Sequence, residues 1–197
     1  MTQLRQISGS EQLPACRYRD LRREVTVSEL MKRFRNAERF VALCRQCPRY
    51  GVTWVCPPFD YDTTEWLMRW ERATLVASVI EPEGESVPGR MARPLMLARR
   101  RHVEKLLHEI AGEQKGKTVA LGAFGGCDIC GEGRCNRVQG GPCRFPEQAQ
   151  PSLAALGFDV SAIMSELFNL PLQWPADGSL PARLTIVSAV LSARSKD

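Results

Sequence analysis

The sequence predicts an α/β layered fold with a central, mostly parallel four-stranded sheet that is flanked by helices. Apolar runs of the length expected for strands cover residues 38–44, 74–81, 117–124 and 182–193. Amphipathic segments between these runs indicate helices. Strands and helices therefore alternate along the chain, as they do in folds with a mostly parallel sheet. The alternative is an α+β fold with a mixed sheet.

Capping residues mark where the predicted helices begin. Thr26, with Glu29 three residues later, predicts a helix over about 27–36. Asp62 and Glu65 repeat this pattern and predict the start of another helix. Apolar periodicity and the stop signal Gly112 predict a further helix at 94–112. Residues 151–157 and 159–170 are predicted to form two short helices.

The length and composition favour one soluble domain. With 197 residues the chain can bury one sizeable core. We expect a single cysteine-rich metal-binding domain over 1–197, in which residues 1–25 form a loosely ordered extension. No apolar run approaches a membrane span, and the polar start has no apolar segment of a secretory signal. The expected location is therefore cytoplasmic, without contact to a membrane.

The basic residues give a formal net charge of +5 and are densest in residues 97–105. This stretch could contact an anionic partner, but no nucleic-acid motif accompanies it. The favoured interpretation is a solvated helix face, and nucleic acid is not an expected partner. His102 and His108 are six residues apart, so on a helix they do not share a face and are not expected to bind one metal together.

Seven of the eight cysteines fall into two groups, and four of them make the second group. Their spacing is Cys-x2-Cys-x4-Cys-x7-Cys, at Cys127, Cys130, Cys135 and Cys143. Four thiolates on one glycine-rich stretch can surround a single centre. Structural zinc sites usually pair two Cys-x2-Cys units, whereas this group has one such unit, widening gaps and a proline beside a cysteine. The spacing favours iron–sulfur, with [4Fe–4S] as the expected cluster type and zinc as the alternative.

The first group has three cysteines, at Cys44, Cys47 and Cys56. A closed tetrahedral site needs four ligands. Cys16 could supply the fourth, or it could be an incidental buried thiol. If it is incidental, the first site keeps an open position for a small-molecule ligand. If the strands that precede the two groups are parallel, both groups emerge at the same edge of the sheet and lie close together.

Both groups belong to longer motifs. The first motif is Cys-x2-Cys-x2-Tyr-Gly-x2-Trp-x-Cys-Pro-Pro, carried by Cys44, Cys47, Tyr50, Gly51, Trp54, Cys56, Pro57 and Pro58. The second is carried by Gly126, Cys127, Cys130, Cys135, Pro142, Cys143, Arg144, Pro146, Ser152, Ala155 and Gly157. Over about residues 20–193 the chain thereby resembles a cysteine-rich family of predicted metal-binding proteins, the domain of unknown function 2284.

The resemblance implies a set of seven metal ligands that leaves Cys16 out: Cys44, Cys47, Cys56, Cys127, Cys130, Cys135 and Cys143. It assigns no activity. Trp54 is expected to shield the first site from water. Ala154 stands where relatives tend to carry Glu, so no role is expected for a carboxylate at that position.

Three functions follow as hypotheses. The first is an iron–sulfur protein with two clusters that transfers electrons or acts as accessory reductant to a larger enzyme, with a redox protein as partner. The second is a redox enzyme whose three-cysteine cluster binds a small molecule. The third is a zinc-stabilised interaction module. Motifs of nucleophilic and acid/base enzymes are missing from the sequence, so no catalytic residue is assigned and the question of enzyme activity stays open.

Overall fold

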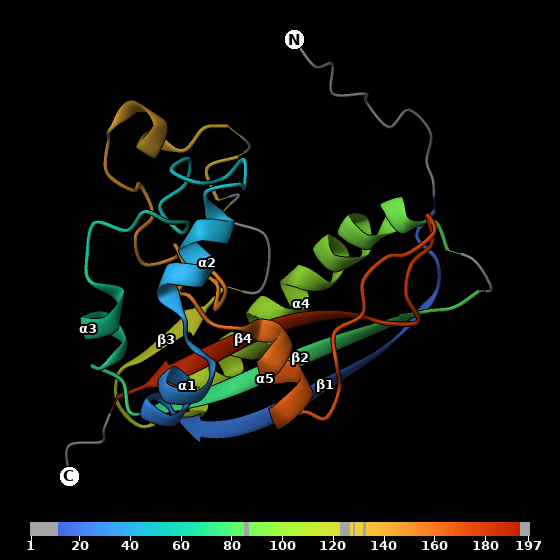
Figure 1. Cartoon of the computed structure of the whole chain (residues 1–197), viewed down its shortest axis with the longest axis horizontal. Helices are drawn as coiled ribbons and strands as arrows, with labels where there is room; N and C mark the ends of the chain where they lie inside the picture. Colours follow the sequence, from blue (N-terminus) through green and yellow to red (C-terminus); the bar gives the residue numbers. More distant parts are fainter. Residues whose placement is uncertain (1–11, 85–86, 123–126, 128, 132, 194–197) are drawn as a thin grey trace.

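Four strands form one sheet in which every hydrogen-bonded pair runs antiparallel (Figure 1). The computed structural model describes residues 12–84, 87–122, 127, 129–131 and 133–193. Within these residues the strands are β1 (Cys16–Thr26), β2 (Arg72–Pro82), β3 (Thr118–Leu121) and β4 (Leu184–Ser192), in the order β1-β2-β4-β3. The prediction of a mostly parallel sheet is therefore wrong, and the fold is α+β.

The place of β4 explains why parallel pairing does not occur. The long helix α4 (Ala92–Glu113) joins β2 to β3, an arrangement that usually makes two strands parallel neighbours. Both strands pair antiparallel with β4, so they run in the same direction without pairing with each other. The last strand of the chain fills the gap between them, which the order of elements along the sequence does not reveal.

The predicted strand at 38–44 is a helix, α2 (Ala37–Cys44). The Asn36 side chain accepts a hydrogen bond from the Arg39 N–H at 3.0 Å and caps the helix. No residue of α2 is fully buried, so this segment is not the core strand that its apolar composition suggested. Cys44 is consequently the last residue of a helix.

An edge strand that the apolar pattern did not predict completes the sheet. β1 pairs with β2 from Cys16 to Thr26 and includes residues 16–25 of the expected N-terminal extension. Its residues are mostly charged, and they are exposed or half-buried. Charged side chains are common on edge strands, and they hide the alternation by which strands are recognised.

Most other predicted elements lie close to their expected positions. The remaining helices are α1 (Val27–Phe34), α3 (Thr63–Leu67) and α5 (Val160–Leu167), with short 3-10 turns η1 (Gly89–Met91) and η2 (Asn136–Gln139). Residues 151–157, predicted to be helical, form turns instead. The predicted strands at 74–81, 117–124 and 182–193 correspond to β2, β3 and β4, although residues 123 and 124 lie outside the described part.

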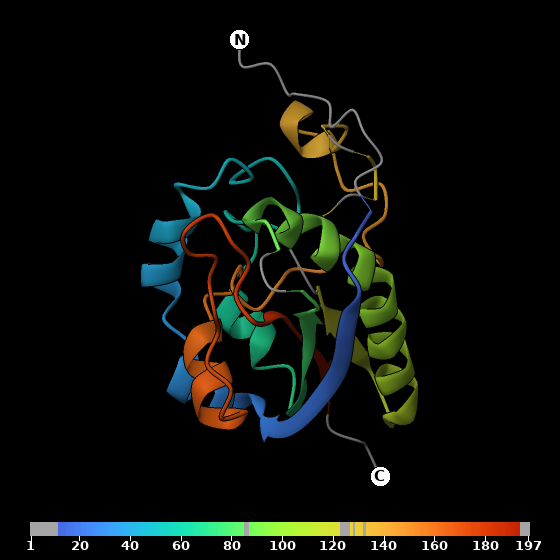
Figure 2. The ribbon, with the colours of Figure 1, turned by 90° about the vertical axis from the view of Figure 1, so that its right-hand side faces the viewer.

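The sheet separates two hydrophobic clusters, as Figure 2 shows with α4 on one side and α1 and α5 on the other. Successive residues of β2 point to opposite faces. Leu75 and Ala77 contribute to the cluster under α1 and α5, whereas Val76 and Ile80 contribute to the cluster under α4. Among the described residues, no helix has both the length and the apolarity that a membrane crossing requires.

Candidate metal centre

Two cysteine-bearing segments lie side by side beyond α2 and β3 (Figure 1). The first cysteine segment comprises residues 44–58 and begins at the end of α2. The second comprises residues 127–149, apart from 128 and 132, and follows β3. The expected proximity of the two groups is therefore found, but parallel strands do not cause it. A helix end and a strand end deliver the two segments to the same place.

The first cysteine segment folds back on itself. The Gly51 N–H donates to the carbonyl of Pro57 at 2.8 Å, and Gly51 has a φ of +72°, a conformation that favours glycine. Cys56 thereby returns towards the start of the segment. Burial raises the pKa of the Cys44 thiol, and the neighbouring Cys56 and Cys47 raise it further. The Cys47 N–H also donates to the Cys44 carbonyl at 2.9 Å, so the three cysteines belong to one folded segment.

All four cysteines of the second group line one cavity of about 260 Å³. Gly131 and Gly133, with φ of +84° and +69°, turn the backbone between Cys130 and Cys135. Gly126, the glycine that precedes the group in the family motif, lies outside the described residues. Burial raises the pKa of the Cys127 thiol, a hydrogen bond from the Ile129 backbone lowers it, and the other three cysteines raise it.

Residues of the first segment form a wall of this second cavity. Trp54, Thr53 and Val55 line it together with the four cysteines. The Trp54 Nε1–H donates to the Gly141 carbonyl at 3.1 Å, which ties the indole to the second segment. Trp54 was expected to shield the first group, and in the structure its side chain lines the cavity of the second.

Arg137 connects the two segments from the other direction. It follows Cys135 in η2, and its guanidinium donates to the carbonyls of Thr53 and Cys56, each at 2.6 Å. It also donates to the carbonyl of Pro58. The sequence reasoning did not single out Arg137, because one arginine between cysteines carries no signal of contacts to residues 84 positions away.

Cys16 lies apart from the first group. It begins β1 opposite Pro82, and its Sγ is 3.4 Å from the Pro14 carbonyl. Burial raises the pKa of its thiol, a hydrogen bond with Tyr18 lowers it, and the charge of Glu83 raises it. None of these neighbours is a cysteine, so the position of Cys16 supports the interpretation as an incidental thiol.

The donor chemistry of the two groups fits a thiophilic metal centre, although the thiols are not drawn together as ligands. Among the described residues, no set of three or more His, Cys, Asp or Glu side chains is arranged as a closed metal site. Four thiols around one cavity are nevertheless a soft donor set of the kind that zinc and iron–sulfur clusters require. Thr53 Oγ1, buried beside them, has no hydrogen-bond partner in the described part. A sulfur atom in the cavity could accept a hydrogen bond from this hydroxyl group.

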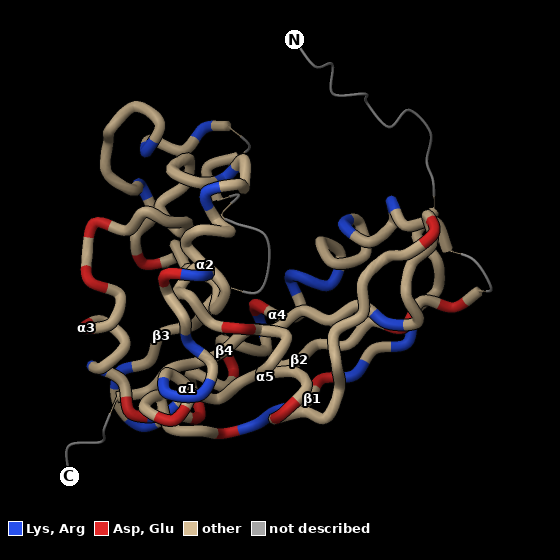
Figure 3. Tube along the Cα trace, in the orientation of Figure 1, with Lys and Arg blue, Asp and Glu red and all other residues tan. Residues whose placement is uncertain are grey.

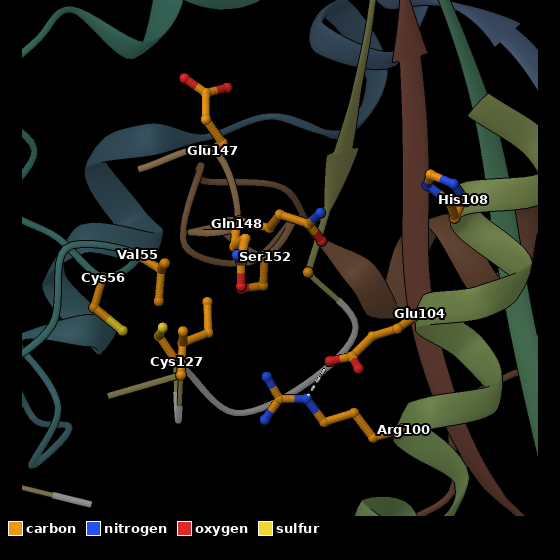
Figure 4. Close-up of a pocket in the computed structure, with 12 residues that line it drawn as sticks. Val55, Cys56, Arg100, Glu104, His108, Cys127, Glu147, Gln148 and Ser152 are labelled. Atoms are coloured by element: carbon orange, nitrogen blue, oxygen red, sulfur yellow. Dashed lines mark hydrogen bonds and ion pairs between the residues drawn. The ribbon is translucent and has the colours of Figure 1, made fainter. Parts of the chain in front are cut away.

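A larger cavity of about 380 Å³ lies where the two groups meet α4 (Figure 4). Cys56 of the first group and Cys127 of the second both line it, and their sulfurs lie on the same side in the figure. The α4 wall carries Arg100, Glu104 and His108. A molecule in this cavity could therefore reach both cysteine groups and three polar side chains.

Comparison with known proteins identifies one family. A family model described as a predicted metal-binding protein, DUF2284, matches residues 31–192. The match contains all seven cysteines of the two groups and leaves Cys16 outside. No curated protein and no solved structure matches the chain.

Proposed function

This chain belongs to the DUF2284 family of predicted metal-binding proteins, and we propose that the metal is held as iron–sulfur clusters that serve in electron transfer. The second group, Cys127, Cys130, Cys135 and Cys143, would hold one [4Fe–4S] cluster. The first group, Cys44, Cys47 and Cys56, would hold a second. The natural partner would be a redox protein for which this chain acts as electron carrier or accessory reductant.

The observation that carries the proposal is the shared cavity of the second group. Four cysteines line about 260 Å³ of space, under a wall formed by Trp54 and Val55. A cluster is larger than a single ion, so it suits a lined cavity better than a tight tetrahedral contact of four sulfurs. Apolar walls limit access of water and thereby influence the potential of a cluster.

The charges around the cysteines support the same proposal. Figure 3 shows basic positions on both cysteine segments, which carry Arg45, Arg49, Arg134, Arg137 and Arg144. A cluster bound by four thiolates is an anion, because four negative thiolates exceed the positive charge of the usual cluster core. Nearby guanidinium groups would offset this charge. A cytoplasmic location, which keeps thiols reduced, would suit such a centre.

Metal analysis of anaerobically purified protein tests the proposal. We expect a brown protein that contains iron and acid-labile sulfide. In a Cys130→Ser variant we expect iron and sulfide to fall by about half, because one of two clusters loses a ligand. Colourless protein with stoichiometric zinc and no sulfide would contradict the proposal and favour the zinc-stabilised module.

A redox enzyme is the second candidate, and the larger cavity favours it. Cys56 and Cys127 line that cavity from different groups, so a bound small molecule would lie next to both centres. The first group has only three cysteines, and Cys16 lies elsewhere, so one position at that centre would be open to a ligand. Titration of small molecules into the reduced protein, followed by EPR, separates the candidates. A ligand-dependent spectrum supports the enzyme, and an invariant spectrum supports simple electron transfer.

A further inference from the structure

β3 is the shortest strand of the sheet, and it covers only one end of β4 (Figure 1). It pairs with Ala189–Ser192, and the next residue of the chain, Gly122, donates its N–H to the Pro151 carbonyl at 2.7 Å instead of continuing the strand. Within the described part of the chain, residues 184–188 of β4 therefore have no strand partner on this side. A cavity of about 640 Å³ lies here, and residues 184–187 line it.

Four other parts of the chain surround this space, the apolar cavity. Its walls include Phe40 of α2, Met96 of α4, Phe158 and Trp174. Trp174 is 72% exposed, and Leu43, which also lines the cavity, is 53% exposed. Covering large exposed apolar surface with a ligand is favourable, because it removes that surface from water. The volume lies in the range of about 300–1,000 Å³ that is typical of small-molecule sites.

Two charged residues line the apolar cavity, and they differ in their partners. Asp159 is engaged: its carboxylate accepts from the Ala162 N–H at 2.9 Å and lies 3.8 Å from the Arg39 guanidinium. Arg93, in the first turn of α4, is exposed, and among the described residues its side chain has neither an ion pair nor a hydrogen bond. The cavity thus combines apolar walls with a cation whose charge no neighbour offsets.

We propose that the apolar cavity binds a small carboxylic acid, with its apolar body between Phe40, Phe158 and Trp174 and its carboxylate against Arg93. A guanidinium can donate two parallel hydrogen bonds to a carboxylate. A neutral apolar molecule would leave this cation unused, and a cationic one would be repelled by it. A small molecule suits the site better than a protein surface, because stable protein interfaces cover about 800 Å² on each partner and are not confined to one cavity. This binding does not depend on the metal of the cysteine groups.

Isothermal titration calorimetry with anaerobically purified protein tests the site. The probes are octanoate, 2-naphthoate, octan-1-ol and octylammonium, all below the concentrations at which they form micelles. We expect at least one carboxylate to bind, and octanoate to bind more tightly than octan-1-ol or octylammonium. Arg93→Gln should weaken carboxylate binding by about fivefold or more, because a hydrogen bond between two charged groups is lost. Arg101→Gln removes the same charge from an exposed position of the same helix and should leave the affinity unchanged.

A second variant tests the cavity itself. Ala154 lines it and is exposed, so Ala154→Phe should narrow the space without disturbing the core and should weaken binding of both carboxylates. Ala98→Phe, at an exposed position of α4 outside the cavity, is the control. Circular dichroism shows whether each variant is folded.

Each remaining outcome overturns the inference. These outcomes are that neither carboxylate binds, that octan-1-ol or octylammonium binds as tightly as octanoate, or that Arg93→Gln or Ala154→Phe binds like wild type. Sedimentation velocity adds one more. A dimer that Ala154→Phe converts to a monomer would show that a second copy of the chain covers the cavity. Iron and sulfide contents of the same samples decide the proposed function separately.

Discussion

The guanidinium of Arg137 lies 4.9 Å from the ring centroid of Trp54 and stacks on it. Arg137 lies between the last two cysteines of the second group, and Trp54 lies between the last two cysteines of the first group. Each segment also reaches the backbone of the other. Arg137 donates to the Thr53 and Cys56 carbonyls, and Trp54 donates to the Gly141 carbonyl. The arrangement of either cysteine group therefore depends on the other segment.

Arg137→Gln should loosen both segments. Glutamine keeps a polar group but loses the cation and the three carbonyl contacts. We expect a loss of about 2 kcal/mol in the free energy of unfolding, because hydrogen bonds from a charged donor are worth more than neutral ones. Cys56 should react faster with iodoacetamide, which peptide mass spectrometry measures. The control is Arg134→Gln in the same segment, because within the described part of the chain the hydrogen bonds of Arg134 join it to Gly131 and Arg144 of its own segment. Unchanged reactivity of Cys56 in Arg137→Gln would contradict the prediction.

Cys16→Ser should leave the metal content unaltered. Cys16 lies at the start of β1, and its electrostatic neighbours are Tyr18 and Glu83. The measurement is iron, zinc and sulfide per chain in the variant and in wild type, with Cys56→Ser as the variant that should lose metal. If Cys16→Ser lost metal to the same extent as Cys56→Ser, Cys16 would be a ligand after all.

Gly157→Ala should destabilise the fold strongly. Gly157 has a φ of +89°, and an added Cβ would lie 2.7 Å from the Cα of Ala37, the first residue of α2. Backbone strain and overpacking together should cost about 3 kcal/mol. Urea denaturation measures this loss. Gly112→Ala is a control in which the effect should have the opposite sign. Gly112 lies within α4, and a Cβ added there would meet open space. This change should raise the free energy of unfolding by about 0.5–1 kcal/mol. Similar stabilities for the two variants would refute the packing argument.

The carboxylate of Asp20 should make the free energy of unfolding depend on pH in the acid range. Burial by itself would raise its pKa, but hydrogen bonds from Ser78 and His102 and the charge of Arg99 outweigh burial, and the net pKa is lowered. The three contacts measure 2.6 Å from Ser78 and 2.8 Å from each of the other two. A lowered folded-state pKa contributes stability above the unfolded value of about 3.9, and this contribution is lost as the pH falls through the folded value.

Asp20→Asn is therefore expected to be less stable than wild type at pH 7, by about 1–2 kcal/mol. The difference should shrink as the pH falls below about 4, because protonation removes the advantage of the wild type. Urea denaturation at pH 7 and at pH 3 gives both values. Glu24→Gln, on the same strand and in an exposed ion pair with Arg72, should change stability by less than about 0.5 kcal/mol. A difference for Asp20→Asn that stays constant with pH would exclude the linkage.

The predicted starts of α1 and α3 are confirmed, because these helix starts depend only on neighbouring residues of the same segment. Thr26 caps α1 by accepting from the Glu29 N–H at 3.1 Å, and Asp62 accepts from the Thr64 and Glu65 N–H groups at the start of α3. These bonds join residues two or three positions apart, so the sequence contains all of their partners. The strand predicted at 38–44 is wrong because the apolar composition of this segment suits a strand as well as a helix, and the capping residue Asn36 is the signal that favours the helix.

Residue types and their order are enough to give the spacing of the seven cysteines, the family and the chemistry of a soft donor set. Three features depend on long-range packing: β4 lies between β2 and β3, Arg137 stacks on Trp54 across the two cysteine segments, and Arg100 lines a cavity beside Cys56 and Cys127. These contacts join residues far apart in the chain. Such contacts result from packing the two hydrophobic clusters on the two faces of the sheet, and no local pattern encodes them.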